Sequence, residues 1–262
     1  MISVRGLTKR FGAVTAVDGV TFDVARGEVF GLLGENGAGK TTTLRMLATL
    51  LRPTAGEAVI GGVNLLERPG EVRRMVGILF EGGVYDRLTA RENIRYFGKL
   101  HGLGGKALEE RIDELLDVFS MSEYADRRAG QFSKGMRQKV VIARSIVHDP
   151  PVLLMDEPTA GLDVTAARLV HDFVAQAKAQ GKTIIFSSHN MTEVEKLVDR
   201  VGVIHKGRLA ALGTVPELVE KTGSRDFEEA FVRLAGGRDA PAGAGSASAP
   251  GDRSAAAPGG GR

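Results

Sequence analysis

The 262-residue chain contains no cysteine and no tryptophan, and aromatic residues make up only 5% of it. The lack of cysteine excludes disulfide bonds and thiolate metal sites, and it suits a reducing compartment such as the cytoplasm. Long apolar runs are missing as well, since none approaches the ~18 to 20 residues that a membrane-spanning helix needs. The opening segment, MISVRGLTKR, lacks the apolar core of a secretory signal. We therefore expect a cytoplasmic protein that does not itself cross a membrane.

Neither sign of charge dominates the sequence. The 35 lysines and arginines stand against 32 acidic residues, the formal net charge is +3, and the two signs are interspersed. This pattern is typical of a solvated, mixed-charge surface. Without a basic patch or many aromatic side chains, nucleic acid is not an expected partner. The hydrophobic content of 43% is sufficient for the core of one large domain or of two small lobes.

Short apolar runs alternate with helix-compatible segments over most of the chain. The run Val29–Leu33 is apolar on both faces, as in a strand inside a parallel sheet. A helical segment over 40–51 follows it and is stopped by Pro53. The patterns predict further strands at 58–60, 76–80, 152–155 and 183–186, helices at 134–147, 164–179 and 192–199, and a hairpin of 201–204 with 208–211 around Lys206-Gly207. Together they predict an α/β fold with a mostly parallel sheet covered on both faces.

Three stretches differ from this α/β core. Residues 1–24 hold short β-like runs separated by turns. Within residues 82–150, apolar side chains such as Leu108, Ile112 and Leu115 recur at helical spacing, so we expect a helical subdomain inserted into the core. Residues 235–262 are rich in glycine, alanine, proline and serine and are expected to form a disordered tail. The folded domain is therefore expected to span residues 1–234.

A glycine-rich turn between the first buried strand and the first long helix fits the phosphate-binding pattern G-x-x-x-x-G-K-[ST]. Glycines let the backbone bring its N–H groups against phosphate oxygens, and the helix N-terminus attracts negative charge. In this pattern the lysine reaches the β- and γ-phosphates, and the hydroxyl after it binds Mg²⁺. The alternative is a surface glycine turn, but the apolar strand before it and the helix after it favour phosphate binding. The nucleotide-binding residues expected here are Gly34, Asn36, Gly37, Ala38, Gly39, Lys40, Thr41 and Thr42.

A second element ends the apolar strand Val152–Met155 with two acids, Asp156 and Glu157. A carboxylate at this end of a buried strand would lie beside the phosphates, so Asp156 is expected to hold Mg²⁺ through water. Glu157 is suited to polarise the attacking water as a general base. The alternative is that both acids cap the next turn, and the upstream phosphate loop favours the catalytic interpretation.

A third element narrows the family. The segment Phe132-Ser133-Lys134-Gly135-Met136-Arg137-Gln138 resembles the signature loop of ABC ATPases, usually Leu-Ser-Gly-Gly-Gln, although Lys134 and Met136 depart from that form. In the same order come Ala160-Gly161-Leu162-Asp163, which resembles the D-loop, and Ser187-Ser188-His189, which resembles the switch histidine. The simpler alternative for Ser133 and Asp163 is helix capping. Phe11 is similar in position to the aromatic residue that stacks on adenine in this family. The simpler alternative for Phe11 is a place in the hydrophobic core.

One position departs from the resemblance. After the strand 76–80, ABC ATPases usually place a glutamine near Mg²⁺, whereas this chain has Glu81. A carboxylate also offers an oxygen, but it adds a charge beside the metal. Either Glu81 takes that metal-site role with altered coupling, or backbone or water takes it.

The resemblance covers residues 2 to about 234 and implies a P-loop NTPase (RecA-like) core, an N-terminal antiparallel β subdomain and an inserted α-helical subdomain. It implies an ATPase using ATP and Mg²⁺, with Lys40, Glu157 and His189 in catalysis, Thr41, Asp156 and Glu81 at the metal, and Phe11, Ser133, Gly135 and Asp163 on the nucleotide. Two such subunits, expected to be identical chains, would enclose ATP between the phosphate loop of one and the signature loop of the other.

A separate transmembrane permease is the other implied partner, which would hold the protein at the inner face of the cell membrane. The run Tyr85–Asn93 and the ending Glu228–Phe231 resemble ATPases of the sodium-efflux or multidrug-export branch. The alternatives are a soluble ABC ATPase that acts on DNA or ribosomes, and a P-loop kinase or GTPase. The former usually carries long coiled coils or tandem units, and neither is visible. The latter has no use for the signature segment or for His189.

Overall fold

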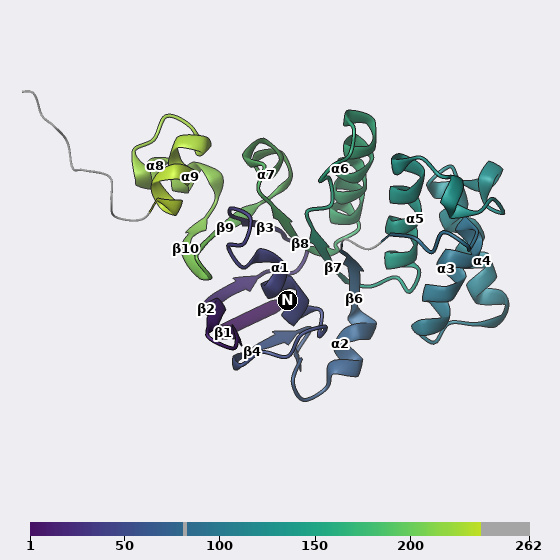
Figure 1. Cartoon of the computed structure of the whole chain (residues 1–262), viewed down its shortest axis with the longest axis horizontal. Coiled ribbons are helices and arrows are strands. Elements are labelled where there is room, and N and C mark those ends of the chain that lie inside the picture. The colour runs from purple at the N-terminus through teal and green to yellow at the C-terminus, as the bar shows by residue number, and fades with distance from the viewer. Residues whose placement is uncertain (81–82, 237–262) are drawn as a thin grey trace, which may run out of the picture.

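The computed structural model describes residues 1–80 and 83–236 (Figure 1). Their strands form two sheets, one of four strands in the order β2-β1-β4-β5 and one of six in the order β10-β9-β3-β8-β7-β6. This arrangement confirms the predicted α/β class with an N-terminal antiparallel β subdomain. Glu81 and, beyond Ala235 and Gly236, the expected tail over 235–262 lie outside the described residues.

The smaller sheet is antiparallel throughout. Its strands are β1 (Ile2–Phe11), β2 (Val14–Val24), β4 (Ala55–Ile60) and β5 (Val63–Asn64). Strands β1 and β2 are much longer than the short β-like runs from which they were predicted. At the hairpin tip Arg10, Phe11, Val14 and Thr15 are all exposed, so the backbone pairing of Phe11 with Val14, rather than an apolar periodicity, extends the two strands there.

The larger sheet is parallel except at one edge. Its strands are β3 (Val29–Leu33), β6 (Val76–Leu79), β7 (Val152–Asp156), β8 (Thr183–Ser188), β9 (Arg200–His205) and β10 (Arg208–Gly213). Only β10 runs antiparallel, as the second arm of the predicted hairpin with β9. All residues of β3, β7 and β8 are buried, which explains the continuous apolar runs Val29–Leu33, Val152–Met155 and Ile184–Phe186 within them. Because these strands are parallel, their carboxyl ends meet at one edge of the sheet.

Helices cover both faces of this sheet. Helix α1 (Lys40–Leu47) lies between the two sheets and shares a buried cluster with them, and α2 (Pro69–Met75) closes the cluster beside β6. Helices α6 (Val164–Ala179) and α7 (Met191–Leu197) pack on the opposite face (Figure 1). The prediction of α1 to residue 51 is wrong at its end, because Thr49 adopts the left-handed conformation (φ 57°) and terminates the helix before Pro53.

The helical region lies at one side of the molecule, beyond β6 and α6 in Figure 1. It consists of α3 (Ala90–Leu100), α4 (Gly105–Val118) and α5 (Lys134–Ile146), with short 3₁₀ turns at Ser122–Tyr124 and Ala129–Gln131. Sequence periodicity indicated α4 and α5 but not α3. Helix α3 begins at a capping box between Thr89 and Glu92, a local signal that apolar spacing does not report.

At the other side, α8 (Val215–Thr222) and α9 (Phe227–Ala235) follow β10. Phe227 and Phe231 of α9 are buried, and α9 contacts α8 and β9, so this end of the described chain is part of the folded core. Among the described residues, no helix is long and apolar enough to cross a bilayer.

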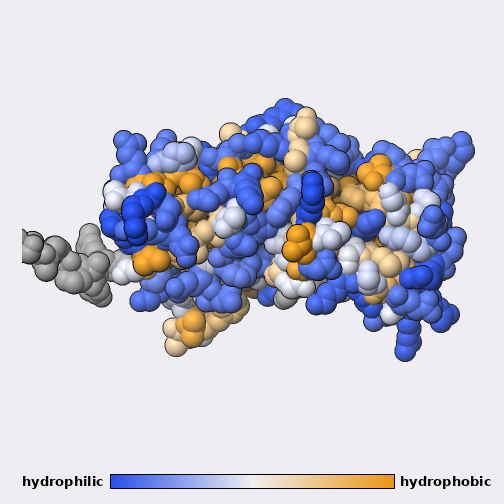
Figure 2. All heavy atoms as spheres, turned by 90° about the horizontal axis from the view of Figure 1, so that it is seen from above, coloured by the Kyte–Doolittle hydropathy of each residue, from blue (hydrophilic) through white to orange (hydrophobic). Residues whose placement is uncertain are grey.

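The surface is largely hydrophilic, with hydrophobic side chains interspersed over the face seen from above in Figure 2. The most exposed large hydrophobic residue within the described ranges is Val164, at 87%. It is the first residue of α6 and directly follows Asp163.

Candidate functional site

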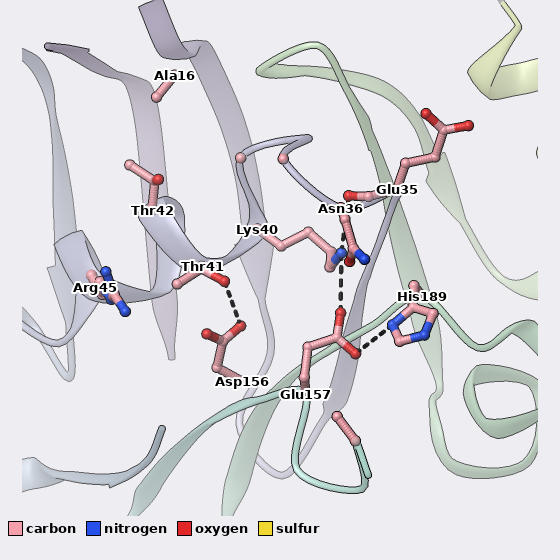
Figure 3. A pocket seen from close by; sticks show the side chains of 13 residues that line it. Ala16, Glu35, Asn36, Lys40, Thr41, Thr42, Arg45, Asp156, Glu157 and His189 are labelled. Carbon is pink, nitrogen blue, oxygen red and sulfur yellow. Dashed lines mark hydrogen bonds and ion pairs between the residues drawn. The ribbon is translucent and has the colours of Figure 1, made fainter. Parts of the chain in front are cut away.

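A cavity of about 370 Å³ opens at the carboxyl edge of the parallel sheet, and Figure 3 shows its lining. The loops after β3, β7 and β8 meet there, as expected for an open α/β sheet. Its lining residues are Ala16, Glu35, Asn36, Gly37, Gly39, Lys40, Thr41, Thr42, Arg45, Asp156, Glu157, Ala160 and His189. The phosphate loop, the two acids Asp156 and Glu157, and His189 therefore surround one space.

The loop from β3 to α1 depends on glycine at two positions. A Cβ at Gly34 would lie 2.4 Å from the carbonyl oxygen of Ile204, so the loop passes directly against β9. Gly39 has φ +111°, and a Cβ there would lie 2.7 Å from the carbonyl oxygen of Ala16. These close approaches hold the loop as a tight backbone turn whose N–H groups can serve as anion ligands.

Lys40 is the buried cation of the cavity, with only 4% of its surface exposed. Its Nζ donates hydrogen bonds to the carbonyl oxygens of Gly34 (2.6 Å) and Glu35 (3.1 Å), so the loop itself holds the ammonium group. The same Nζ lies 3.1 Å from Oε1 of Glu157. The cation of α1 and the carboxylate that follows β7 thus face each other in the cavity (Figure 3).

Thr41 and Asp156 form an oxygen-rich corner. The Thr41 hydroxyl donates to Oδ1 of Asp156 at 3.0 Å, and the hydroxyl of buried Ser187 donates to the same oxygen at 2.6 Å. Two hydroxyls therefore hold the Asp156 carboxylate in a fixed orientation. A hydroxyl and a carboxylate are the hard oxygen donors that suit Mg²⁺, which uses few protein ligands and keeps water or phosphate oxygens.

Glu157 follows β7 in the left-handed region, with φ 46°. Its backbone N–H is shared by the carbonyl oxygen (3.1 Å) and the hydroxyl (3.0 Å) of Ser187, which holds this costly conformation. Oε2 is 2.7 Å from Nδ1 of His189. Oε1 is buried and accepts no hydrogen bond within the described part of the chain, although Lys40 is nearby. One carboxylate oxygen is thus oriented by His189 and the other retains acceptor capacity.

Six predicted nucleotide contacts are not among the lining residues: Gly34 and Ala38 of the phosphate loop itself, and Ser133, Gly135, Asp163 and Phe11 outside that loop. Ser133 is the N-cap of α5 and accepts from the Met136 N–H at 3.2 Å, and Asp163 caps α6 through the Ala166 N–H at 2.9 Å. Both residues are exposed, and Gly135 is half-buried. Each cap is compatible with a further contact, because a cap uses only part of the acceptor's capacity.

Phe11 is also outside the lining, at the end of β1. Its ring is 49% exposed, with the ammonium of Lys9 5.2 Å from the ring centre. The alternative interpretation of Phe11 as a core residue is therefore wrong. An exposed ring beside a cation is suited to stacking on a planar base.

Sequence reasoning missed several contributors to the site. Arg45 lines the cavity from α1, one helical turn beyond Thr41, a spacing that could have indicated it. Ala16 reaches the cavity from β2 of the other sheet, and no sequence signal points to it. Ser187 was noted only as a neighbour of His189, whereas its hydroxyl contacts both Asp156 and Glu157.

Comparison with known proteins gives the family. The profile described as ABC transporter matches residues 17–160, more than half of the chain. The chain is 46% identical over 238 residues to the ABC transporter ATP-binding protein NatA of Bacillus subtilis (strain 168), covering 88% of this chain and 97% of that protein. It is 40% identical over 236 residues to the daunorubicin resistance ATP-binding protein DrrA3 of Streptomyces coeruleorubidus, covering 90% and 74%.

Solved structures agree with the sequence relatives. An ATP binding subunit of an ABC transporter superposes with a TM-score of 0.81 at 33% identity, covering 89% of this chain and 99% of that one. The dimeric structure of MJ0796, a bacterial ABC transporter cassette, superposes with a TM-score of 0.74 at 26% identity, covering 82% and 98%. The chain therefore belongs to the ABC transporter family, as one of its ATP-binding, ATP-hydrolysing subunits.

Proposed function

We propose that the cavity at the carboxyl edge of the parallel sheet binds MgATP and that its hydrolysis, between two copies of the chain, drives export through a separate membrane subunit. The observation that carries this proposal is the meeting of Lys40, Thr41, Asp156, Glu157 and His189 around one space. These five side chains come from three different segments of the sequence and supply the parts that phosphoryl transfer to water requires.

The loop from Gly34 to Lys40 would receive the phosphates. Its backbone amides and the N-terminus of α1 favour negative charge, and the ammonium of Lys40 is already held by two loop carbonyls. The γ-phosphate would replace Glu157 as the anionic neighbour of Lys40. Glu157 would then be released from its ion pair at the moment when the substrate arrives.

The donors at Thr41 and Asp156 fit Mg²⁺, because their oxygens already converge and Ser187 fixes the carboxylate. Within residues 1–80 and 83–236 there is no cluster of three acidic or histidine side chains for an all-protein metal cage. This agrees with a metal held mainly by phosphate and water oxygens. When bound, the ion would neutralise charge on the phosphate oxygens. Glu81 was predicted to join this metal site, and we retain it in the proposal as a candidate ligand.

Glu157 would act as the general base toward the attacking water. The oxygen Oε1, which accepts no hydrogen bond from the described residues, has the acceptor capacity to take a proton from water. His189 holds the other oxygen at 2.7 Å and so orients the carboxylate. Oε1 also lies 3.1 Å from Nζ of Lys40, so the carboxylate faces the phosphate loop.

A second copy of the chain would complete the site. Ser133 and Asp163 stand exposed at the N-termini of α5 and α6, outside the lining of their own chain's cavity, and Asp163 directly precedes the exposed Val164. In a head-to-tail dimer they would face the γ-phosphate of the partner's nucleotide together with Gly135. ATP would then stabilise the closed dimer, and hydrolysis would release it, because the nucleotide supplies the differential contact.

Export and position at the inner face of the membrane rest on the relatives. Among them are the daunorubicin resistance protein and a Nod factor export ATP-binding protein of Ralstonia nicotianae, 40% identical over 246 residues. A chain of this kind needs a membrane-spanning partner to move its cargo. A soluble role on DNA or ribosomes, the other candidate, is disfavoured by the mixed surface charge.

The variant Glu157→Gln tests the proposal. We expect ATP turnover to fall by about 10²- to 10⁴-fold, since a general base contributes on that scale, while MgATP affinity remains. Light scattering of the purified variant with MgATP should show a dimer that is absent without nucleotide. A variant that stays monomeric at saturating MgATP would contradict the two-subunit site. Unchanged turnover would contradict the role of Glu157 as base.

A further inference from the structure

A buried hydrogen-bonded chain lies behind the strand that carries His189. The hydroxyl of Ser188, the last residue of β8, donates to Oε2 of Glu193 in α7 at 2.9 Å. The other oxygen of Glu193 lies 2.9 Å from Nε2 of His171 in α6. Glu193 is only 4% exposed and Ser188 only 1%. A carboxylate this buried is rare unless its partners have a structural or functional purpose.

The chain reaches the backbone on both sides of His189. The Ser188 hydroxyl accepts from the backbone N–H of Asn190 at 3.0 Å. The side chain of Asn190 in turn accepts from the backbone N–H of Glu193 at 3.3 Å, which caps α7. His189 is therefore enclosed in a short loop whose two flanking residues are both tied to Glu193.

The side chains of Ser187 and Ser188, the last two residues of β8, have different partners. Successive side chains of a strand point to opposite faces, so Ser187 and Ser188 face different surroundings. The Ser187 hydroxyl contacts Asp156 and the Glu157 backbone in the cavity, whereas the Ser188 hydroxyl contacts Glu193 in the helical layer. The end of β8 is thus fastened to the catalytic carboxylates on one side and to α6 and α7 on the other.

We propose that Glu193 is a positioning residue for hydrolysis: together with His171 and Ser188 it fixes the backbone at Ser188–Asn190 and so holds His189 against Glu157. This inference deepens the proposed function and rests on it. Neither Glu193 nor His171 lines the cavity, so both act through His189 rather than on the nucleotide. Displacing a catalytic group by about 1 Å can lower the rate by about 10²-fold. A residue such as Glu193, which does not touch the nucleotide, can therefore affect turnover by fixing the position of His189.

Kinetics of two Glu193 variants form the first test. Glu193→Ala removes both acceptors, and we expect kcat to fall by between about 10- and 100-fold with little change in ATP affinity. Glu193→Gln should retain kcat within about threefold, because its amide oxygen accepts from Ser188 and its NH₂ group donates to a neutral His171. Glu28→Ala is the matched control, since Glu28 is also buried and paired, with Arg200, but lies at the other end of β3. The control should leave kcat unchanged.

A double-mutant cycle separates positioning from general destabilisation. If Glu193 acts through His189, then Glu193→Ala should lower kcat no further in a His189→Ala background. Losses that multiply in the double variant would overturn the proposal. Should Glu193→Ala not fold, Ser188→Ala carries the same cycle with a smaller change in volume.

A readout without turnover keeps this inference separable from the proposed function. The chain has five histidines, so the imidazole nitrogens of His189 can be assigned in a ¹⁵N-histidine spectrum by comparison with His189→Ala. We expect the His189 signals to shift or broaden in Glu193→Ala and to remain in place in Glu193→Gln and Glu28→Ala. Unmoved His189 signals in Glu193→Ala would overturn the positioning role. An inactive wild-type protein whose His189 signals respond as expected would contradict the proposed function alone.

Discussion

The ammonium Nζ of Lys40 lies 3.1 Å from Oε1 of Glu157, so the buried cation of the phosphate loop is paired with the carboxylate that directly follows β7. Their side chains are 5% and 19% exposed, which leaves little water to screen either charge. Each group therefore compensates the other within the cavity. In the proposed function, an entering triphosphate would exchange one anionic partner of Lys40 for another rather than meet an uncompensated cation.

Replacing Lys40 by alanine should remove both the phosphate ligand and the partner of Glu157. We expect nucleotide affinity to collapse and turnover to fall by at least about 10²-fold, the scale for losing one preorganised charged donor. Binding of a fluorescent ATP analogue and phosphate release measure the two effects.

The control is Lys106→Ala, at a lysine that is 90% exposed and paired with Glu110 on α4. It should leave both measurements at the wild-type level. If Lys40→Ala behaves like this control, the cavity is not the nucleotide site.

Gly34 and Gly70 give opposite predictions for the same substitution. At Gly34 a Cβ meets the Ile204 carbonyl at 2.4 Å, so Gly34→Ala should destabilise the fold by roughly 1–3 kcal/mol and weaken ATP binding. At Gly70, within α2, a Cβ meets nothing within 4 Å, so Gly70→Ala should stabilise by about 0.5–1 kcal/mol. Urea unfolding of both variants checks this. An unaffected Gly34→Ala would show that the loop can move away from β9.

Asp163 allows helix capping to be separated from a contact with a second subunit. Asp163→Ala should cost about 1 kcal/mol of stability, and Asp163→Asn should cost much less, because asparagine caps as well as aspartate. If the carboxylate also serves the dimer, then Asp163→Asn should reduce ATP-dependent dimerisation several-fold at nearly unchanged stability.

Asp226, which caps α9 in the same way through the Glu229 N–H, supplies the matched control. Asp226→Asn should leave dimerisation as in the wild type. If Asp163→Asn and Asp226→Asn dimerise equally well with ATP, the role of Asp163 is helix capping and not a contact with a second subunit.

The stacked imidazoles of His101 and His148 predict a loss of stability at mildly acidic pH. Their ring centres are 3.5 Å apart, at the end of α3 and after α5, and Nε2 of His148 contacts the Val76 carbonyl. Burial, and secondarily the charge of His101, lowers the pKa of His148 from 6.5 to about 4, against the opposing effects of the Val76 carbonyl and Asp149. Between about pH 4 and pH 6.5, His148 therefore binds a proton in the unfolded chain but not in the folded chain.

Stability from this group is complete above pH ~6.5 and is lost as the pH falls toward ~4. A pKa unit is worth about 1.4 kcal/mol, and because the ring is partly exposed we expect a loss of only about 1 kcal/mol at about pH 5. His148→Gln keeps a donor for Val76 but cannot titrate there, so its unfolding free energy should change less between about pH 7 and about pH 5. Parallel curves for the two proteins would refute the assignment.

Local signals made much of the fold predictable. The strand Val152–Met155 and the helix over 164–179 were placed almost to the residue, because a continuous apolar run and the capping Asp163 mark their ends. The phosphate loop was equally clear, since its glycines, lysine and threonine are adjacent in sequence. These features are decided by neighbours along the chain.

Contacts between distant residues were beyond sequence reasoning. Thr41 and Asp156 are 115 positions apart, and only the register of β3, β8 and β7 brings them together. The ion pair of Lys40 with Glu157 and the anchoring of Ser188 by Glu193 depend on that register in the same way. The helices α8 and α9 were missed because each is shorter than ten residues, whereas helical periodicity is read over a window of about 11 to 18 residues.

The left-handed backbone of Glu157 has a further consequence. A glycine or asparagine would adopt φ 46° with less strain, so the wild-type residue sacrifices roughly 1 kcal/mol of folding stability at this position. A carboxylate therefore stands at a position whose backbone conformation alone would favour glycine or asparagine. A substitution of Glu157 by glycine or asparagine that raises the melting temperature and abolishes ATP turnover would show directly how much folding stability the carboxylate costs.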